Sequence, residues 1–245
     1  ASQMPYMIMG NGSNILVRDG GYKGALIKLG EAFAFISADK DIIHAGCGAL
    51  MSQVANEALK KGLGGFEFAG GIPGSIGGAV FMNAGAYGGE MKDIIKSVNV
   101  ISRDGEREYE LVPEKLQLEY RHSIFCDTCD IIESVKIKLH EESKDKIKSM
   151  MKELTERRNN KQPLSLPSAG SFFKRPKGYY AGRLIEDAGL KGLTVGGAQV
   201  SQLHAGFIVN KGGATAGDII ELMHMVQATV MDKYSVMLEP EVRII

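Results

Sequence analysis

The sequence of residues 64–89 reads GGFEFAGGIPGSIGGAVFMNAGAYGG and holds ten of the chain's 31 glycines. Glycine allows positive φ angles and carries no Cβ, so successive backbone N–H groups can converge on a phosphate. Paired glycines on both sides of Pro73 argue against plain turns. The stretch therefore predicts a cradle for a diphosphate, and a set of tight turns in a β-rich segment is the alternative.

Composition sets the class of protein around this stretch. Of 245 residues, 44% are hydrophobic and 24% charged, as in a globular protein of one large or two modest domains. The 29 basic and 29 acidic residues balance, so no net field attracts nucleic acid or an anionic membrane. No apolar stretch approaches the roughly 20 residues that span a bilayer, and no signal peptide opens the chain. We expect a cytoplasmic protein without membrane insertion or nucleic-acid partner.

The apolar pattern predicts a mixture of strands and helices. Short apolar runs bounded by Gly, Asn and Asp predict strands at residues 7–9, 15–17 and 25–27. A strand with one wet face is predicted where Val135, Ile137 and Leu139 alternate with lysines. Helical spacing predicts a helix over residues 50–61 that ends at Gly62, a helix over residues 180–188, and another after a capping box of Thr215 and Asp218. A one-sided helix is predicted over residues 143–159, with a charged, solvated face and an apolar face of Ile147, Met150, Met151 and Leu154. The proline-bounded residues 163–167 are the best domain boundary.

Other nucleotide motifs are weak or missing. No Gly-x-x-x-x-Gly-Lys followed by Ser or Thr occurs, which argues against ATP hydrolysis. Gly46-Cys47-Gly48 precedes a predicted helix, but Met51 stands where a dinucleotide fingerprint needs its third glycine. The second glycine cluster, Gly10-Asn11-Gly12-Ser13-Asn14, suits phosphate or ribityl contacts and equally suits a plain hairpin turn.

The three cysteines are too few for a disulfide scaffold. Cys126 and Cys129 have the spacing of a metal or redox pair, but a structural zinc site needs a second pair of ligands, and His122 is the only close candidate. We favour two ordinary thiols, and we predict no metal site.

Taken together, several motifs are similar to one family. Gly12-Ser13-Asn14, the residues 71–78 and Asn83-Ala84-Gly85 resemble the flavin-binding domain of the UDP-N-acetylenolpyruvoylglucosamine reductases (MurB). Tyr120-Arg121-His122-Ser123, the run Gly-Ser-Phe-Phe-Lys at residues 170–174 and Pro-Glu-Val-Arg at 240–243 resemble its catalytic segments, in the family's order. The motif at residues 204–210 adds to the match. The flavin loops alone would indicate only the wider vanillyl-alcohol-oxidase-like superfamily.

This resemblance implies an α+β fold in two domains. A two-part FAD-binding domain of mixed sheets with helices would cover residues 1–162, and the tail 236–245 would return to it. A smaller α+β substrate-binding domain would cover residues 163–235. The chain lacks an inserted loop with a substrate-clamping tyrosine, so it resembles the family's shorter, second type. Few residues precede Gly12, and we therefore expect the N-terminal part of the FAD domain to be incomplete.

The resemblance also implies FAD as cofactor and NADPH as co-substrate. NADPH would reduce the flavin, whose hydride would then pass to the enolpyruvyl ether of a UDP-sugar in bacterial cell-wall precursor synthesis. The positions that match the family's flavin contacts are Asn11, Gly12, Ser13, Asn14, Gly71, Ile72, Pro73, Gly74, Ser75, Gly77, Gly78, Asn83, Gly85, Ser123 and Arg243.

Three side chains would carry the catalysis. Arg121 would pair with the substrate carboxylate and the developing enolate, because a guanidinium fork suits carboxylate geometry. Ser171 would donate a proton, which a serine hydroxyl can do when it is aimed at a strongly basic enolate carbon. Glu241 would orient or assist this acid. Without the resemblance, each residue has a plainer explanation: Arg121 a surface salt bridge, Ser171 a turn or helix-cap serine, and Glu241 a terminal strand with solvent-facing charges.

The implied substrate contacts are Lys174, Arg175 and Tyr120, of which the two cations would meet the diphosphate. The family often has asparagine at the position of Arg175. We expect a monomer. A flavin-dependent sugar or alcohol oxidase of the same superfamily is the alternative function, although its usual covalent-flavin His or Cys is not evident. A non-catalytic nucleotide-binding module would be favoured if Arg121, Ser171 and Glu241 proved far apart.

Overall fold

The computed structural model describes residues 4–245. Their backbone forms two compact units: residues 4–12 with Gly24–Arg158, and Ser13–Lys23 with Asn159–Ile245. Each unit has a hydrophobic core of its own. Within the described residues, no helix combines the length and the apolar character needed to cross a membrane.

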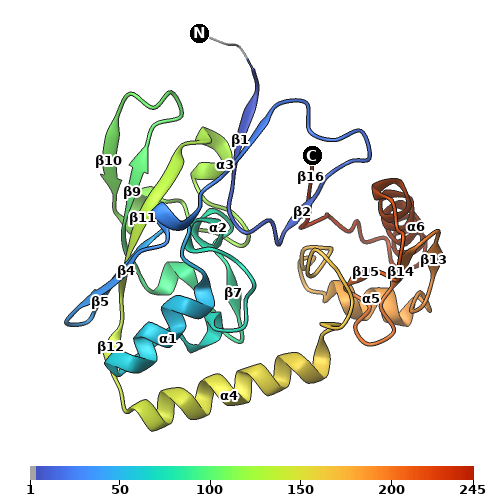
Figure 1. Ribbon diagram of the computed structural model, residues 1–245. Coiled ribbons are helices and arrows are strands. Elements are labelled where there is room, and N and C mark those ends of the chain that lie inside the picture. Colours follow the sequence, from blue (N-terminus) through green and yellow to red (C-terminus); the bar gives the residue numbers. More distant parts are fainter. Residues whose placement is uncertain (1–3) are drawn as a thin grey trace. The chain divides into compact units, whose positions relative to one another are not determined.

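The first unit is built on a five-stranded sheet of order β10-β9-β11-β5-β4, in which every neighbouring pair is antiparallel (Figure 1). Its strands are β4 (Ile36–Asp39), β5 (Ile42–Gly46), β9 (Ile95–Ile101), β10 (Glu108–Leu111) and β11 (Ile131–Lys138). Val135 and Ile137 of β11 are fully buried while Lys138 is exposed, which confirms the predicted strand with one wet face. Helices α1 (Met51–Lys61) and α2 (Ile76–Phe81) pack against this sheet.

Helix α1 forms where the sequence predicts it. The backbone N–H of Leu50 donates to Gln53 Oε1 at 2.9 Å, and Val54, Ala55 and Ala58 are buried on one face. The helix ends because Gly62 adopts the left-handed conformation with a φ of 69°, and its N–H closes the last turn on the carbonyl of Leu59.

Smaller elements complete the first unit. The strands β1 (Tyr6–Met9) and β3 (Ala25–Lys28) pair in parallel, and β6 (Leu63–Gly64) pairs with β12 (His140–Glu141). The hairpin of β7 (Gly85–Ala86) and β8 (Gly89–Glu90) follows α2. Helix α3 covers Phe125–Thr128, and short 3-10 helices cover Glu31–Phe33, Glu67–Ala69, Met91–Asp93 and Pro113–Lys115.

Helix α4 (Lys144–Lys161) is the long helix drawn in yellow in Figure 1. Its predicted apolar face is only partly correct: Ile147 is buried and Met151 and Leu154 are half-buried, but Met150 is 42% exposed. At 3.6 residues per turn, Met150 lies about 60° away from Ile147 and outside the narrow line that continues through Met151 and Leu154.

The second unit packs helices on a small antiparallel sheet. The sheet has the strands β13 (Thr194–Val195), β14 (Ala198–Val200) and β15 (Ile208–Asn210), and helix α6 (Ala216–Tyr234) packs on β13 and β14. Helix α5 (Ala181–Asp187) contacts α6, and a parallel pair joins β2 (Ile15–Leu16) to β16 (Arg243–Ile244).

The start of α6 confirms the predicted capping box and adds a cap that the sequence did not show. The Asp218 N–H donates to Thr215 Oγ1 at 3.0 Å, and the Thr215 N–H donates to Asp218 Oδ2 at 2.9 Å. Asp19, 197 residues from Ala216, accepts the N–H groups of Ala216 and Gly217 at 2.7 and 2.8 Å. The first turn of α6 is therefore held by two carboxylates.

The unit boundary lies within α4, close to the predicted boundary at residues 162–163. By backbone contacts the tail belongs to the second unit, because β16 pairs with β2 and the Glu241 N–H donates to the Phe172 carbonyl at 2.8 Å. The return of residues 236–245 to the FAD-binding domain stays a prediction.

Candidate active site

The two glycine clusters of the sequence meet in the first unit. Asn11 Nδ2 donates to the Pro73 carbonyl at 2.9 Å, across 62 residues of sequence. Gly10 lies so close to Ser75 that a Cβ on it would collide with Ser75 Oγ. The loop that the sequence could explain as a plain hairpin turn is therefore packed on the glycine stretch.

The glycine stretch in turn rests on the segment before α1. Ser75 begins α2, and its Oγ accepts the Gly78 N–H at 3.4 Å. The Gly77 N–H donates to the Cys47 carbonyl at 2.8 Å, and a Cβ on Gly77 would lie 2.8 Å from Cys47 Cβ. Gly77 is thus required by close packing. The Gly46-Cys47-Gly48 string supports this stretch.

Several backbone N–H groups of these loops are available to a ligand. Within residues 4–245, the N–H groups of Asn11, Gly12, Gly71 and Ser75 donate to no protein acceptor. Ser75 is buried, and buried backbone donors in folded proteins nearly always have a partner. Its N–H and those of the glycine-rich loops therefore suit a bound anion. The residues present fit the diphosphate of a dinucleotide cofactor.

Asn83 and Gly85, two of the predicted flavin contacts, are engaged in holding the β7–β8 hairpin. Asn83 is fully buried, and its Nδ2 donates to Glu90 Oε2 and to the Glu119 carbonyl, both at 2.9 Å. Its Oδ1 accepts the Lys92 N–H at 2.9 Å. A Cβ on Gly85 would lie 2.6 Å from Glu90 Cγ. The hydrogen-bonding groups of the Asn83 side chain are occupied by the protein, so Asn83 can position the site without donating to a ligand.

The segment that carries Arg121 is a tight turn. Arg121 has a φ of 56°, and Glu119 and His122 exchange backbone hydrogen bonds at 3.2 and 3.3 Å around it. The Arg121 guanidinium lies 5.0 Å from the centroid of the Tyr120 ring, and its Nη2 donates to the Gly85 carbonyl at 3.4 Å. The structure therefore brings Tyr120, Arg121 and Gly85 together within the first unit.

Ser123 ends this turn in the core. Its side chain is fully buried, and its Oγ donates to the Phe81 carbonyl at 2.7 Å. The hydroxyl proton is therefore donated to the last residue of α2. Donation of this hydroxyl to a flavin would first have to break the contact with Phe81.

In the second unit, Ser171 and Glu241 lie on neighbouring segments. Ser171 forms a bridge with Phe207, and the next residue, Phe172, accepts the Glu241 N–H at 2.8 Å. Asn14 Nδ2 donates to the Glu241 carbonyl at 3.1 Å, and the Arg243 N–H donates to the Asn14 carbonyl at 3.0 Å. Backbone hydrogen bonds and the Asn14 side chain thus gather three distant parts of the chain, which carry Ser171, Glu241, Asn14 and Arg243.

The two cations predicted to hold a diphosphate have partners in the protein. Lys174 Nζ lies 3.4 Å from Glu239 Oε2, and the Lys174 N–H donates to the Glu239 carbonyl at 2.8 Å. The Arg175 guanidinium lies 4.6 Å from the centroid of the exposed Tyr180 ring. An exposed ion pair contributes little to stability, so a phosphate can compete for Lys174.

Arg158 is a charged residue that the sequence placed on a solvated face. It is half-buried, and a Cβ on Gly71 would lie 3.1 Å from Arg158 Cδ. Burial lowers the pKa of its guanidinium, and Tyr87 opposes this shift. No carboxylate within the described residues pairs with it. The signal that could have found it is its helical spacing from Met151 and Leu154.

His204 supports the segment beside Ser171. Its Nδ1 accepts the Gly206 N–H at 3.0 Å, and the Gly206 carbonyl accepts the Phe172 N–H at 2.8 Å. Burial lowers the pKa of His204, which favours the neutral ring that this acceptor role needs.

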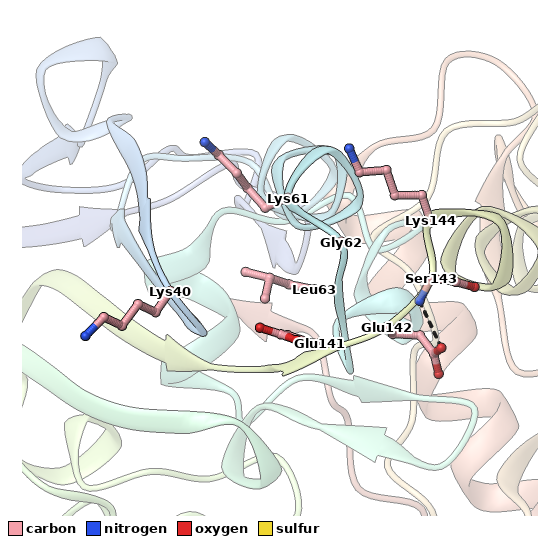
Figure 2. A pocket seen from close by; sticks show the side chains of 8 residues that line it. All are labelled: Lys40, Lys61, Gly62, Leu63, Glu141, Glu142, Ser143 and Lys144. Atoms are coloured by element: carbon pink, nitrogen blue, oxygen red, sulfur yellow. Dashed lines mark hydrogen bonds between the residues drawn. The ribbon is translucent and has the colours of Figure 1, made fainter.

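Two other features hold no recognisable site. No group of three or more His, Cys, Asp or Glu side chains in the described chain could hold a metal ion, and His122 Nε2 instead lies 3.4 Å from Asp127 Oδ2. A shallow pocket in the first unit is lined by Lys40, Lys61 and Lys144 among others, but Figure 2 shows their ammonium groups at separate places and not gathered on one point. None of the predicted site residues lines this pocket.

Comparison with known proteins finds relatives that match this chain over its whole length. Residues 1–108 match the model of an FAD binding domain, and residues 162–245 match the C-terminal domain of UDP-N-acetylenolpyruvoylglucosamine reductase. The chain is 53% identical to the UDP-N-acetylenolpyruvoylglucosamine reductase of Clostridium botulinum, over 100% of this chain and 79% of that protein. The chain belongs to the UDP-N-acetylenolpyruvoylglucosamine reductase family.

Other members of the family are similar in sequence and in fold. The reductase of Clostridioides difficile is 50% identical over 99% of this chain and 79% of its own length. The crystal structure of the Thermus caldophilus enzyme (MurB) matches with a TM-score of 0.87 and 40% identity, covering 99% of this chain and 86% of that one. These matches confirm the resemblance, the α+β fold class and the FAD-binding domain that the motifs predicted.

Proposed function

We propose that this reductase uses NADPH and FAD to convert the enolpyruvyl ether of UDP-N-acetylglucosamine enolpyruvate to UDP-N-acetylmuramate, in bacterial peptidoglycan precursor synthesis. Membership of the family supports the enzyme class and the cofactor. The observation that carries the proposal is the packing of the Gly10–Asn14 loop on the glycine stretch, which gathers free N–H groups suited to a diphosphate. When bound, FAD supplies hydride transfer between NADPH and the enolpyruvyl carbon.

The cofactor contacts of this proposal are of two kinds. Asn11, Gly12, Gly71 and Ser75 offer backbone N–H groups to the phosphates. Asn83, Gly85 and Ser123 shape the site from within the protein, because their polar groups or their lack of a Cβ already serve the hairpin and the end of α2.

The catalytic contacts follow from the chemistry of an enolate. In the proposal, Arg121 binds the carboxylate conjugated to the reacting double bond and stabilises the negative charge that develops there. Ser171 Oγ then donates its proton to the neighbouring carbon, and Glu241 orients or assists that hydroxyl. The backbone hydrogen bond between Glu241 and Phe172 supports this pairing, because it holds the acid and the hydroxyl on adjacent segments.

The proposed substrate contacts are Lys174, Tyr120 and Arg175. Lys174 would exchange its ion pair with Glu239 for a phosphate, and Tyr120 and Arg175 would contact the nucleotide sugar. A monomeric state and a cytoplasmic location belong to the same proposal.

Anaerobic half-reactions test this function directly. The purified protein should show a flavin spectrum that NADPH bleaches and that the enolpyruvyl UDP-sugar restores within seconds. A flavin that only oxygen reoxidises would contradict the proposal and would favour the alternative, a flavin-dependent sugar or alcohol oxidase. A protein that binds no flavin would contradict both functions.

A further inference from the structure

Two thiols remain outside the proposed chemistry, and they lie on one helical turn. Cys126 belongs to α3, and Cys129 follows as its C-terminal cap with a φ of 57° and an N–H that donates to the Phe125 carbonyl at 3.1 Å. Cys126 is half-buried, whereas Cys129 is exposed. Both cysteines are free thiols.

The spacing suits a disulfide more than a metal. The hydrogen bond from the Cys129 N–H to the Phe125 carbonyl closes one helical turn, in which Cα atoms three residues apart are about 5 Å from each other. A disulfide spans Cα atoms roughly 4.4–6.8 Å apart, so the two cysteines lie within its reach. A metal would need further ligands, and the described residues contain no such cluster. The third cysteine differs: Cys47 is buried, and burial raises the pKa of its thiol to about 11, so it is a matched unreactive thiol within the same chain.

Cys126 also touches the anchor of the Arg121 turn. Its Sγ donates to the Phe81 carbonyl at 3.6 Å, and the same carbonyl accepts the Ser123 hydroxyl at 2.7 Å. The other end of the turn is held by Asn83 at the Glu119 carbonyl. The segment from Glu119 to Cys126 is thus fixed at both ends to residues that follow or end α2.

We propose that Cys126 and Cys129 are a dithiol modification site, oxidised to an intramolecular disulfide by small disulfides such as oxidised glutathione. The exposed Cys129 thiolate attacks the small disulfide, forms a mixed disulfide and releases one glutathione thiolate. Cys126 sulfur then attacks the mixed disulfide at Cys129 and releases the second glutathione. The pair loses two electrons and two protons, and the small disulfide gains them as two thiols.

Oxidation removes the Cys126 proton, so the Phe81 carbonyl loses the Cys126 thiol as a donor. The turn that carries Arg121 is then held less firmly. Because one hydrogen bond is lost, we expect kcat/KM for the sugar to fall roughly two- to tenfold. This effect on turnover rests on the proposed function, whereas the disulfide itself does not.

Peptide mass measures the chemistry without any activity assay. Trypsin releases residues 122–136, which contain both cysteines on one peptide. After incubation of the folded holoprotein with oxidised glutathione, we expect this peptide to be lighter by two hydrogens, dithiothreitol to reverse the change, and Cys47 to stay unmodified. A stable glutathione adduct on Cys129, or an unchanged peptide, would overturn the proposal.

A variant with serine at both positions tests whether an effect of oxidised glutathione depends on Cys126 and Cys129. The Cys126→Ser/Cys129→Ser variant keeps a donor for the Phe81 carbonyl, so it should retain its turnover and should not respond to oxidised glutathione. Oxidised wild-type enzyme that turns over the sugar as fast as reduced enzyme would refute the effect on Arg121. If neither the reduced nor the oxidised enzyme reduces the sugar, the proposed function is wrong. The peptide mass still shows whether the disulfide between Cys126 and Cys129 forms.

Discussion

At the scale of single residues, Ser171 is the most informative test of the proposed chemistry. Its segment is fixed by backbone bonds to Phe207 and, through Phe172, to Glu241, so removing the hydroxyl leaves the geometry in place. We expect Ser171→Ala to spare flavin reduction by NADPH and to slow sugar reduction by roughly 10²- to 10⁴-fold, as for a lost general acid. Stopped-flow measurement of the two half-reactions decides it, and equal loss in both would refute the role of Ser171.

His204 makes a second residue-scale prediction, about pH. Burial lowers its folded pKa, with Lys161 and Lys191 acting in the same direction and Glu186 against it. The folded state therefore binds the proton less well than the unfolded state, so the stability contributed by neutral His204 is complete above the unfolded pKa of roughly 6.5 and declines as pH falls below it. Urea titrations should show that wild type loses more stability between pH 7 and pH 5 than His204→Asn does. Parallel losses in the two proteins would contradict this assignment.

At the scale of elements, the start of α6 depends on a residue far away in sequence. Asp19 accepts two of the N–H groups that a helix leaves free in its first turn. We expect Asp19→Ala to lower the free energy of unfolding by about 1–2 kcal/mol, measured by urea denaturation. Asp232→Ala is the matched control, because it removes an exposed acid from the last turn of the same helix and should not destabilise it. Equal losses in both variants would show that Asp19 is not a cap.

Helix ends were predicted better than the buried face of a helix. The stop of α1 at Gly62 and the capping box of Thr215 and Asp218 were predicted correctly, because each depends on residues within one turn. Met150 was predicted wrongly, because periodicity does not say how wide the buried face of a helix is.

At the scale of the whole molecule, cofactor binding depends on the contact between the two glycine clusters. A methyl group on Gly10 would push into Ser75 Oγ, which caps α2. Overpacking of this kind costs about 1–3 kcal/mol, so we expect Gly10→Ala to weaken FAD binding roughly tenfold or more. Fluorescence titration of the apoprotein with FAD measures this, and Gly20→Ala is the control because its Cβ would meet open space. Unchanged affinity in Gly10→Ala would contradict the cradle.

The α+β class, the four longest helices, a few of the strands and the family follow from the sequence alone, because caps, alternation and short motifs are local patterns. Only the tertiary structure decided which predicted site residues are free to meet a ligand. Asn83 and Ser123 match the family's flavin positions, yet their polar groups are occupied by partners elsewhere in the chain. Asn14 reaches Glu241 across 227 residues, and Arg158 turns from a solvated face toward Gly71. Such contacts form only when distant segments pack, so no window of the sequence contains them.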